Sequence, residues 1–357
     1  MNFKYLKELK NCHLCPWDCG INRLDGEKGV CRVGMPEVAY TNFTEVLKSY
    51  SITLLGCSFF CTYCNAYRIS QYPESGWRYR GYVDPPALVE EILHAFKSQY
   101  AQDMSVNKLS FTGGEPSIHT PYLEAVVGLL NKEISGLEKQ ESPPLEKQGI
   151  SQIESPESPH QLDVGLATNG FITRKTMERL SRISSYINFE IKAYDTELHQ
   201  ALTGAPSGPV LENAEWLARK HPEKIRVFRT VVIPGINQEE IHKIARFIQE
   251  IEPSIHYRLV GFRPHFMLYY HPAPTRSLMQ ELVEDCKKLG LENVDYSGYH
   301  PGGSQMTEQM SNNGLKTLYH HLNLAGCYRK PRNCGDCPEN HHCPAVILEP
   351  WTNLPDD

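Results

Sequence analysis

The sequence predicts a mixed α/β fold, an open partial (β/α)6 barrel with cysteine-rich segments at both ends. Three observations support this prediction: short apolar runs alternate with amphipathic stretches, distinctive polar motifs follow those runs, and the 12 cysteines fall in groups. Such alternation is typical of a parallel sheet with helices between its strands. At 357 residues and 40% hydrophobic, the chain is long enough to bury a large core and to carry attached modules.

Six segments have the length and the apolar, β-branched composition of strands. They are residues 48–55, 108–112, 164–168, 187–191, 225–233 and 255–261. Six further segments carry apolar residues at three- and four-residue spacing, as amphipathic helices do. They are residues 85–96, 121–134, 174–183, 210–220, 238–251 and 276–289. Six β/α units of this kind would form an open three-quarter barrel.

We expect three parts along the chain. They are a four-cysteine metal-binding segment at 1–45, the barrel core at 46–270, and a C-terminal region at 271–357 with a second four-cysteine set. Residues 135–161 interrupt the barrel with a repeated Leu-Glu-Lys-Gln and a Ser- and Pro-rich stretch. Because this composition buries little apolar surface, we predict a disordered insertion there.

The charge and the first residues narrow the class of protein. A net charge of -6 without a basic block argues against a nucleic-acid partner. The N-terminus lacks the apolar stretch of a secretory signal, and no segment has the apolar length of a membrane span. We therefore expect a cytoplasmic protein without a membrane partner. In that reducing compartment, grouped cysteines are expected to bind metal rather than to form disulfides.

The first predicted strand leads into a loop that carries Cys57, Cys61 and Cys64. Tetrahedral zinc sites and ordinary cubane clusters take four protein ligands. Three thiolates on one tight loop instead suit an iron–sulfur cube that has one iron left open, and an open iron can bind a substrate. The C-x-x-x-C-x-x-C spacing alone is suggestive, and the motifs that follow decide its meaning.

Polar motifs follow each of the next strands. They are Gly113-Gly114-Glu115-Pro116, Ala167-Thr168-Asn169-Gly170, Glu190-Ile191-Lys192, and Arg229 with Val232-Ile233-Pro234-Gly235. Paired glycines allow backbone to approach a ligand closely, and Glu115 offers an anion to an amino group. Because loops at the C-terminal ends of barrel strands build the active site, we expect these side chains to surround one site.

Together with the three-cysteine loop and Leu202-Thr203-Gly204-Ala205, these motifs resemble the radical S-adenosylmethionine (radical SAM) superfamily, in its branch around pyruvate formate-lyase activating enzyme. The resemblance covers residues 48–274. It implies a TIM-like partial barrel in which Cys57, Cys61 and Cys64 bind a 4Fe-4S cluster. It also implies that S-adenosylmethionine (SAM) binds the open iron and is cleaved reductively to a 5'-deoxyadenosyl radical, which abstracts hydrogen.

The resemblance assigns cofactor contacts to one group of residues. Tyr63, the aromatic residue between the last two cysteines, would lie near the adenine of SAM. Gly113, Gly114 and Glu115 would engage the methionyl amino group. The segment that includes Ile233 would form a wall against the adenine.

The same resemblance implies roles for the polar residues of the later strands. Thr168 and Asn169 would lie near the ribose and the carboxylate of SAM. Glu190 and Lys192 match an acidic-x-Lys pattern of the activating enzymes, although those enzymes usually carry Asp at the position of Glu190. Lys192 and Arg229 are the candidate catalytic residues, and Arg229 is expected to contact a carboxylate.

Two further cysteine sets flank the barrel. Cys286 belongs to neither set and is predicted to be a small core residue. The N-terminal set, Cys12, Cys15, Cys19 and Cys31, suits zinc, a single iron or a cluster that staples a short segment. The C-terminal set is Cys327, Cys334, Cys337 and Cys343. For this set an auxiliary iron–sulfur cluster is favoured over zinc, although the neighbouring His341 and His342 keep zinc open.

The sequence leaves three functions in competition. The first is hydrogen abstraction from a protein or peptide residue, as in glycyl-radical activation, with a ferredoxin or flavodoxin as reductant under anaerobic conditions. The second is a cobalamin-dependent protein C-methyltransferase, such as those acting on methyl-coenzyme M reductase. The third is a non-catalytic electron-transfer or metal-scaffold protein. Aromatic and basic residues at 257–272 are the predicted substrate wall in the first two cases.

Overall fold

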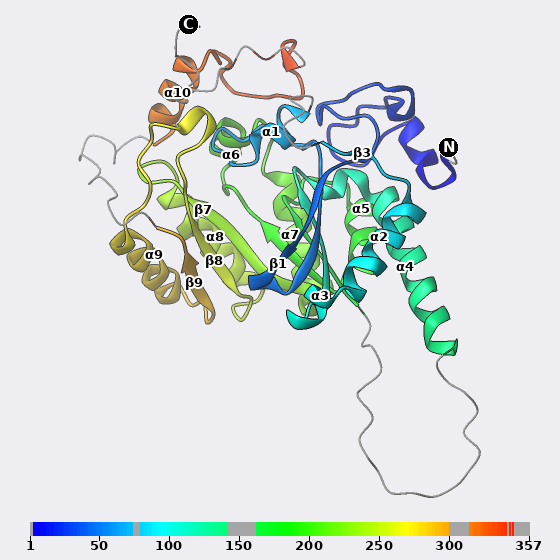
Figure 1. Cartoon of the computed structure of the whole chain (residues 1–357). Helices are drawn as coiled ribbons and strands as arrows, with labels where there is room; N and C mark the ends of the chain where they lie inside the picture. Colours follow the sequence, from blue (N-terminus) through cyan, green and yellow to red (C-terminus); the bar gives the residue numbers. More distant parts are fainter. Residues whose placement is uncertain are drawn as a thin grey trace, which may run out of the picture.

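The computed structural model describes residues 3–73, 79–140, 162–299 and 314–340, together with Cys343 and Ala345. Its centre is a run of parallel strands that curves into an open barrel (Figure 1). These strands are β2 (Ser49–Leu54), β4 (Lys108–Gly113), β5 (Asp163–Thr168), β6 (Tyr186–Glu190), β7 (Ile225–Val232), β8 (Tyr257–Gly261) and β9 (Val294–Ser297). The predicted partial barrel is therefore confirmed, and each of the six predicted strands lies within a few residues of its expected bounds.

The sheet does not close into a full barrel. On one side β1 (Glu37–Thr44) pairs antiparallel with β2 and with the short β3 (Gly81–Tyr82). The resulting nine-stranded sheet has the order β3-β1-β2-β4-β5-β6-β7-β8-β9, and its two end strands are not paired with each other. The sequence prediction missed β1, β3 and β9, because β3 and β9 are short and half of the side chains of β1 are polar.

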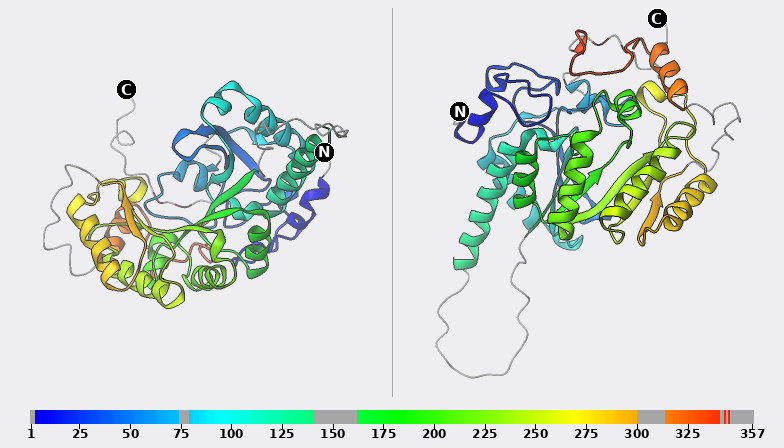
Figure 2. Two further views of the ribbon diagram at one scale, coloured as in Figure 1. Left: turned by 90° about the horizontal axis from the view of Figure 1, so that it is seen from below. Right: turned by 180° about the vertical axis from the view of Figure 1, so that it is seen from behind.

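Helices cover the outside of the curved sheet (Figure 2). They are α2 (Pro85–Lys97), α3 (Gln99–Asp103), α4 (Thr120–Gln140), α5 (Arg174–Ile183), α7 (Gly208–Lys220), α8 (Gln238–Ile251) and α9 (Arg276–Lys288). The amphipathic pattern explains their packing. In α8, for example, Ile241, Ile244, Ala245 and Ile248 are buried at three- and four-residue spacing, so one stripe faces the sheet.

Three helices lie nearer the C-terminal ends of the strands: α1 (Tyr67–Ser70), α6 (Thr196–Thr203) and α10 (Gly314–Leu324). None of these three helices was predicted. Helix α4 runs on to Gln140, so residues 135–140 are helical rather than the start of a disordered insertion. Residues 141–161, the rest of that predicted insertion, lie outside the described residues.

The described parts of the two cysteine-rich segments lie at the same end of the barrel (Figure 1). They meet directly, because a side chain added at Gly335 would come within 2.1 Å of the Trp17 ring. Trp17 in turn donates a hydrogen bond from Nε1 to the Ser58 carbonyl oxygen at 2.8 Å, inside the three-cysteine loop. Among the described residues, no helix has both the length and the apolar character needed to cross a membrane.

Candidate active site

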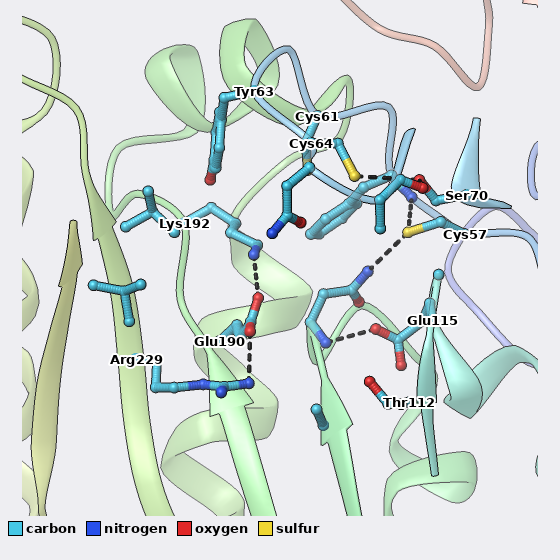
Figure 3. Close-up of a pocket in the computed structure, with 18 of the residues that line it drawn as sticks. Cys57, Cys61, Tyr63, Cys64, Ser70, Thr112, Glu115, Glu190, Lys192 and Arg229 are labelled. Atoms are coloured by element: carbon cyan, nitrogen blue, oxygen red, sulfur yellow. Dashed lines mark hydrogen bonds and ion pairs between the residues drawn. The ribbon is translucent and has the colours of Figure 1, made fainter. Parts of the chain in front are cut away.

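A cavity of about 520 Å³ lies at the C-terminal ends of the parallel strands. It is lined by the three-cysteine loop and by residues at the ends of β4 to β9 (Figure 3). The structure brings nearly all the predicted barrel residues to it. They are Cys57, Cys61, Tyr63, Cys64, Gly113, Gly114, Glu115, Thr168, Asn169, Glu190, Lys192 and Arg229. This common placement agrees with the expectation that motifs at successive strand ends surround one site.

Backbone hydrogen bonds hold the three-cysteine loop against the end of α6. The amide of Phe60 donates to the Thr203 carbonyl oxygen at 2.7 Å, and the amide of Thr62 donates to that of Leu202 at 2.9 Å. Helix α6 then ends at Gly204, whose φ of 81° is the left-handed conformation that glycine adopts without strain. The Leu202-Thr203-Gly204 motif therefore supports the loop rather than contacting the cavity.

The paired glycines of β4 pack against backbone rather than against open space. A Cβ on Gly113 would lie 2.1 Å from the Leu54 carbonyl oxygen, and one on Gly114 would lie 1.8 Å from that of Gly56. The amides of Gly114 and Glu115 donate to the same two oxygens at 2.9 and 2.8 Å. Only glycine permits this approach, so the pair fastens the end of β4 to the base of the cysteine loop.

Glu115 is 1% exposed and is satisfied by donors from its own chain. Its Oε2 accepts from the amide of Asn169 at 2.6 Å, and its Oε1 accepts from the hydroxyl of Thr168 at 2.8 Å and the amide of Ser117 at 3.1 Å. Burial raises the pKa of this carboxyl, and the three donors act in the opposite direction. Glu115 thus joins the ends of β4 and β5 and reaches the cavity in a fixed position.

The three thiols of the loop are shielded from water. Burial raises the pKa of each, to about 12 for Cys61, where Lys192 acts in the opposite direction. The side-chain amide of Asn169 lies 3.7 Å from the Cys57 sulfur, and the Ser70 hydroxyl lies 3.2 Å from that of Cys64. A bound metal would favour the thiolate form directly, because coordination removes the thiol proton.

Glu190, Lys192 and Arg229 form a charged triad on the opposite side (Figure 3). The Arg229 guanidinium donates to Glu190 Oε1 at 2.7 Å, and Lys192 forms an ion pair with Oε2. Burial would raise the pKa of Glu190, but the two cations outweigh it and lower that pKa to about 2. The triad therefore stays fully ionised and carries one net positive charge.

Tyr63 and the predicted substrate wall are only partly where we expected them. Tyr63 lines the cavity, and its ring packs edge-on against Phe262 at 6.4 Å between centroids. Of residues 257–272, Val260, Gly261, Phe262 and Arg263 line the cavity, whereas Phe266 is buried against Tyr67 with ring centroids 5.2 Å apart. Phe266 also packs against Phe60 of the cysteine loop, at 5.5 Å between ring centroids, so it supports that loop rather than lining the cavity.

Ile233 does not line the cavity and is fully buried in the core. Strand β7 ends at Val232, so the alternation that points Arg229 and Val231 into the cavity stops before Ile233. The amide of Ile233 instead donates to the side chain of Asn237 at 2.7 Å. Val231, two residues earlier in the chain, lines the cavity instead.

The structure adds cavity residues that the motifs did not predict. Ser70 is the last residue of α1 and Gln71 follows it, while Ser297 is the last residue of β9 and Gly298 follows it. Because β9 itself was not predicted, no cavity residue was predicted at its end. Gln71 could have been suspected from its position only seven residues after Cys64.

The N-terminal cysteines lie close enough to influence one another. Burial raises the pKa of Cys15, and Cys31, Cys19 and Cys12 add to the effect. The fully buried Arg23 donates to the Gly34 carbonyl oxygen at 2.8 Å and lies 3.9 Å from the Cys12 sulfur. The four N-terminal cysteines therefore lie near one another in the fold.

The C-terminal cysteines also lie near one another in the fold. Cys327, Cys334, Cys337 and Cys343 all line one small cavity beside the cysteine loop. His341 and His342, which the zinc alternative names, lie outside the described residues. Within the described part of the chain, no three Cys, His, Asp or Glu side chains converge on a position for a single metal ion. Cys286, by contrast, is fully buried in α9, as predicted for a core residue.

Comparison with known proteins identifies the family. Residues 51–248, more than half of the chain, match the radical SAM superfamily. The chain belongs to this superfamily. Radical SAM membership implies a 4Fe-4S cluster and SAM, and the donors of the site fit both. Three thiols lie on one loop above a cavity whose opposite side carries fixed hydrogen-bonding and charged groups.

Individual radical SAM relatives are distant. The isethionate sulfite-lyase activating enzyme of Desulfovibrio desulfuricans is 29% identical over 140 residues, which cover 37% of this chain and 45% of that enzyme. The pyruvate formate-lyase-activating enzyme of Staphylococcus aureus is 24% identical over 264 residues, or 71% of this chain and 90% of that enzyme. The chain thus spans less than half of the first relative and most of the second.

Among solved structures, the radical SAM chain is similar to Streptococcus suis SuiB bound to S-adenosylmethionine. The TM-score is 0.46 with 15% sequence identity, over 68% of this chain and 48% of that one.

Proposed function

We propose that this radical SAM enzyme abstracts a hydrogen atom from a residue of a protein or peptide, in the manner of the glycyl-radical activating enzymes. The observation that supports this most is the open side of the barrel. Strands β3 and β9 are the two end strands of the sheet and do not pair with each other, and the cavity is lined on the β9 side by Ser297 and Gly298. An extended segment of another chain could reach the cavity from there. The activating enzymes among its relatives support the same class of substrate.

In this proposal Cys57, Cys61 and Cys64 hold the 4Fe-4S cluster. When cluster and SAM are bound, they supply the reductive cleavage that yields the 5'-deoxyadenosyl radical. The chain's own residues fix the loop: α6 accepts its amides, and the Gly113-Gly114 pair anchors its base. Rigid support of this kind keeps reacting groups at a constant distance.

The two sides of the cavity would bind the two charged ends of the amino acid part of SAM. Glu115 is an anion that suits the amino group, and its fixed position limits where that group can lie. The net positive triad of Glu190, Lys192 and Arg229 suits the carboxylate. The Nε of Arg229 is buried without a partner among the described residues, so it is available as a donor.

Apolar residues would shield the reacting centre. Phe59, Val231, Val260 and Phe262 line the cavity between the polar groups. They leave little room for water beside a bound ligand, and the exclusion of water prevents the loss of reactive intermediates. Arg263 is exposed at the same cavity and is a further candidate contact for the substrate chain.

We further propose that the N-terminal cysteine set binds a metal that holds residues 12–31 together. Such short segments gain their folding energy from the metal. A ferredoxin or flavodoxin is the proposed external reductant of the enzyme. Cobalamin is the cofactor expected only for the methyltransferase alternative, and the second test below measures whether adding it causes protein methylation.

The test uses the full chain, purified without oxygen, reconstituted with iron and sulfide, and reduced with dithionite. Incubation with SAM should yield 5'-deoxyadenosine. The variant Cys61→Ala should lose this product, and Cys286→Ala, which removes a thiol outside the three sets, should retain it. Product from Cys61→Ala, or none from the reconstituted wild type, would contradict the enzyme assignment.

The substrate class is tested with a protein extract from cells grown on deuterated glycine. Mass spectrometry should find deuterium transferred from the macromolecular fraction into 5'-deoxyadenosine. Transfer from the small-molecule fraction alone would overturn the proposal. Methylated protein that forms only when cobalamin is added would replace it by the methyltransferase alternative.

A further inference from the structure

Two arginines next to the C-terminal cysteines lack an anionic partner among the described residues. Arg332 is 2% exposed and donates to the carbonyl oxygens of Ala201 at 3.1 Å and Phe60 at 2.5 Å. Arg32, half-buried, donates to the side-chain oxygen of Asn340 at 2.7 Å and to the Val30 carbonyl oxygen at 3.1 Å. All of these acceptors are uncharged. A buried cation without a counter-ion is costly, so negative charge is expected close by.

The cysteines are the nearest source of such charge. Arg32, Arg329 and Arg332 line the same small cavity as the four cysteines. Glu339 also lines it, but Glu339 is exposed and forms no ion pair with these arginines among the described residues. As thiols, the cysteines are neutral. As ligands of a cubane with an overall charge of about +2, four thiolates would leave a net charge of about -2.

We propose that Cys327, Cys334, Cys337 and Cys343 hold a second iron–sulfur cluster, whose negative charge balances Arg32 and Arg332. A cubane takes its thiolates at separate corners, so these side chains need not converge on one ion position. An additional electron on such a cluster would be stabilised by the three guanidinium groups. Zinc is not reduced, so in a zinc site the three guanidinium groups would have no additional electron to stabilise.

The same arginines connect this second site to the first. Both guanidinium groups lie over the ring of Phe60, at 4.6 Å for Arg32 and 5.3 Å for Arg332. Phe60 lies between Cys57 and Cys61, and Arg332 also holds its carbonyl oxygen. The amide of Cys334 donates to the Gly204 carbonyl oxygen at 2.9 Å, at the end of the helix that supports the loop. A charge change at the second cluster therefore acts directly on the loop of the first.

The experiment compares the double variant Cys334→Ser/Cys337→Ser with the control Cys286→Ser, both as full chains reconstituted anaerobically. The double variant should contain about four fewer irons and four fewer sulfides per chain than the control, with an unchanged zinc content. It should keep the change that SAM causes in the electron paramagnetic resonance spectrum of the first cluster. Equal iron in the two proteins, or loss of one zinc instead, would overturn the proposal.

A second variant tests the charge argument without removing a ligand. Arg329 is exposed and lines the cysteine cavity, so Arg329→Gln should fold normally and keep its iron. Its second cluster should have a more negative reduction midpoint than the wild type, because one stabilising positive charge is gone. An unchanged midpoint would contradict the proposed charge balance. Because metal content and midpoint do not depend on the substrate, failure of the hydrogen-abstraction proposal would leave both results unaffected.

Discussion

The two sides of the active-site cavity are built on different principles. The β4–β5 side, formed by Gly113, Gly114, Glu115, Thr168 and Asn169, is joined by short hydrogen bonds and close backbone contacts. The β6–β7 side, formed by Glu190, Lys192 and Arg229, is joined by ion pairs between side chains that are partly open to the cavity.

The difference separates structural support from charge recognition. The β4–β5 side also carries the base of the cysteine loop, so a change there should disturb both folding and cluster binding. The β6–β7 side can lose one charge and keep its fold, so a change there should act mainly on ligand affinity. The following substitutions test this separation.

The largest effect is expected from Gly114→Ala. Its Cβ would lie 1.8 Å from the Gly56 carbonyl oxygen, and neither backbone can move without breaking the contact between β4 and the cysteine loop. We expect a loss of roughly 4 kcal/mol or more of unfolding free energy, together with poor iron incorporation. Denaturant unfolding and iron analysis measure both.

Gly128→Ala is the matched control, because nothing lies within 4 Å of a Cβ there in helix α4. It should stabilise the protein by about 0.5–1 kcal/mol. If Gly114→Ala behaved like Gly128→Ala, the close packing of the β4–β5 side would be wrong.

Glu115→Gln should have the next largest effect. The amide group cannot accept at both positions, so at least one of the bonds from Asn169 and Thr168 is lost and a buried donor is left unpaired. We expect a loss of about 2 kcal/mol in unfolding free energy. Glu215→Gln, which breaks an exposed i,i+4 pair with Arg219, should change it by less than about 0.5 kcal/mol. Equal losses in the two variants would argue against a structural role for Glu115.

The sequence predicted the parallel strands well, because they are short segments rich in β-branched and aromatic residues, as in β7 with its Ile-Arg-Val-Phe-Arg-Thr-Val-Val sequence. It also predicted which strand ends carry the site. It could not predict β9, which has four residues and two polar side chains, or the inward turn of Ile233. The contact between Arg332 and Phe60 joins residues 272 positions apart, so only the folded chain reveals it.

The two sides should also differ in how they affect the pH dependence of the unfolding free energy. His119 lies behind the β4–β5 side. Its Nδ1 accepts a hydrogen bond from the Arg23 guanidinium at 3.1 Å, and its Nε2 donates to the Leu55 carbonyl oxygen at 2.9 Å. Burial and Arg23 lower its pKa from 6.5 to about 3. Below pH 6.5 the unfolded chain therefore binds a proton that the folded chain does not, so stability falls as the pH falls.

At pH 5 this single histidine should cost about 2 kcal/mol of unfolding free energy relative to pH 7. Glu190, with a pKa of about 2, stays ionised over that range and should contribute little. Between pH 7 and pH 5, the unfolding free energy of His119→Gln should fall less than that of the wild type, as measured by denaturant unfolding at each pH. Identical slopes would show that His119 is not the buried neutral group described above.

The smallest effect is expected on the β6–β7 side. Lys192→Met removes one of two cations around Glu190, and Arg229 remains at 2.7 Å to keep that carboxylate paired. The fold should survive, but the positive charge available to a carboxylate of SAM disappears, so SAM affinity should fall about tenfold or more. Equilibrium dialysis with the reconstituted protein measures this. Lys243→Met removes a cation that pairs with Asp195 and Glu240 away from the cavity, and it should leave SAM affinity unchanged. A Lys192→Met protein that binds SAM normally but unfolds more easily would reverse the distinction between the two sides.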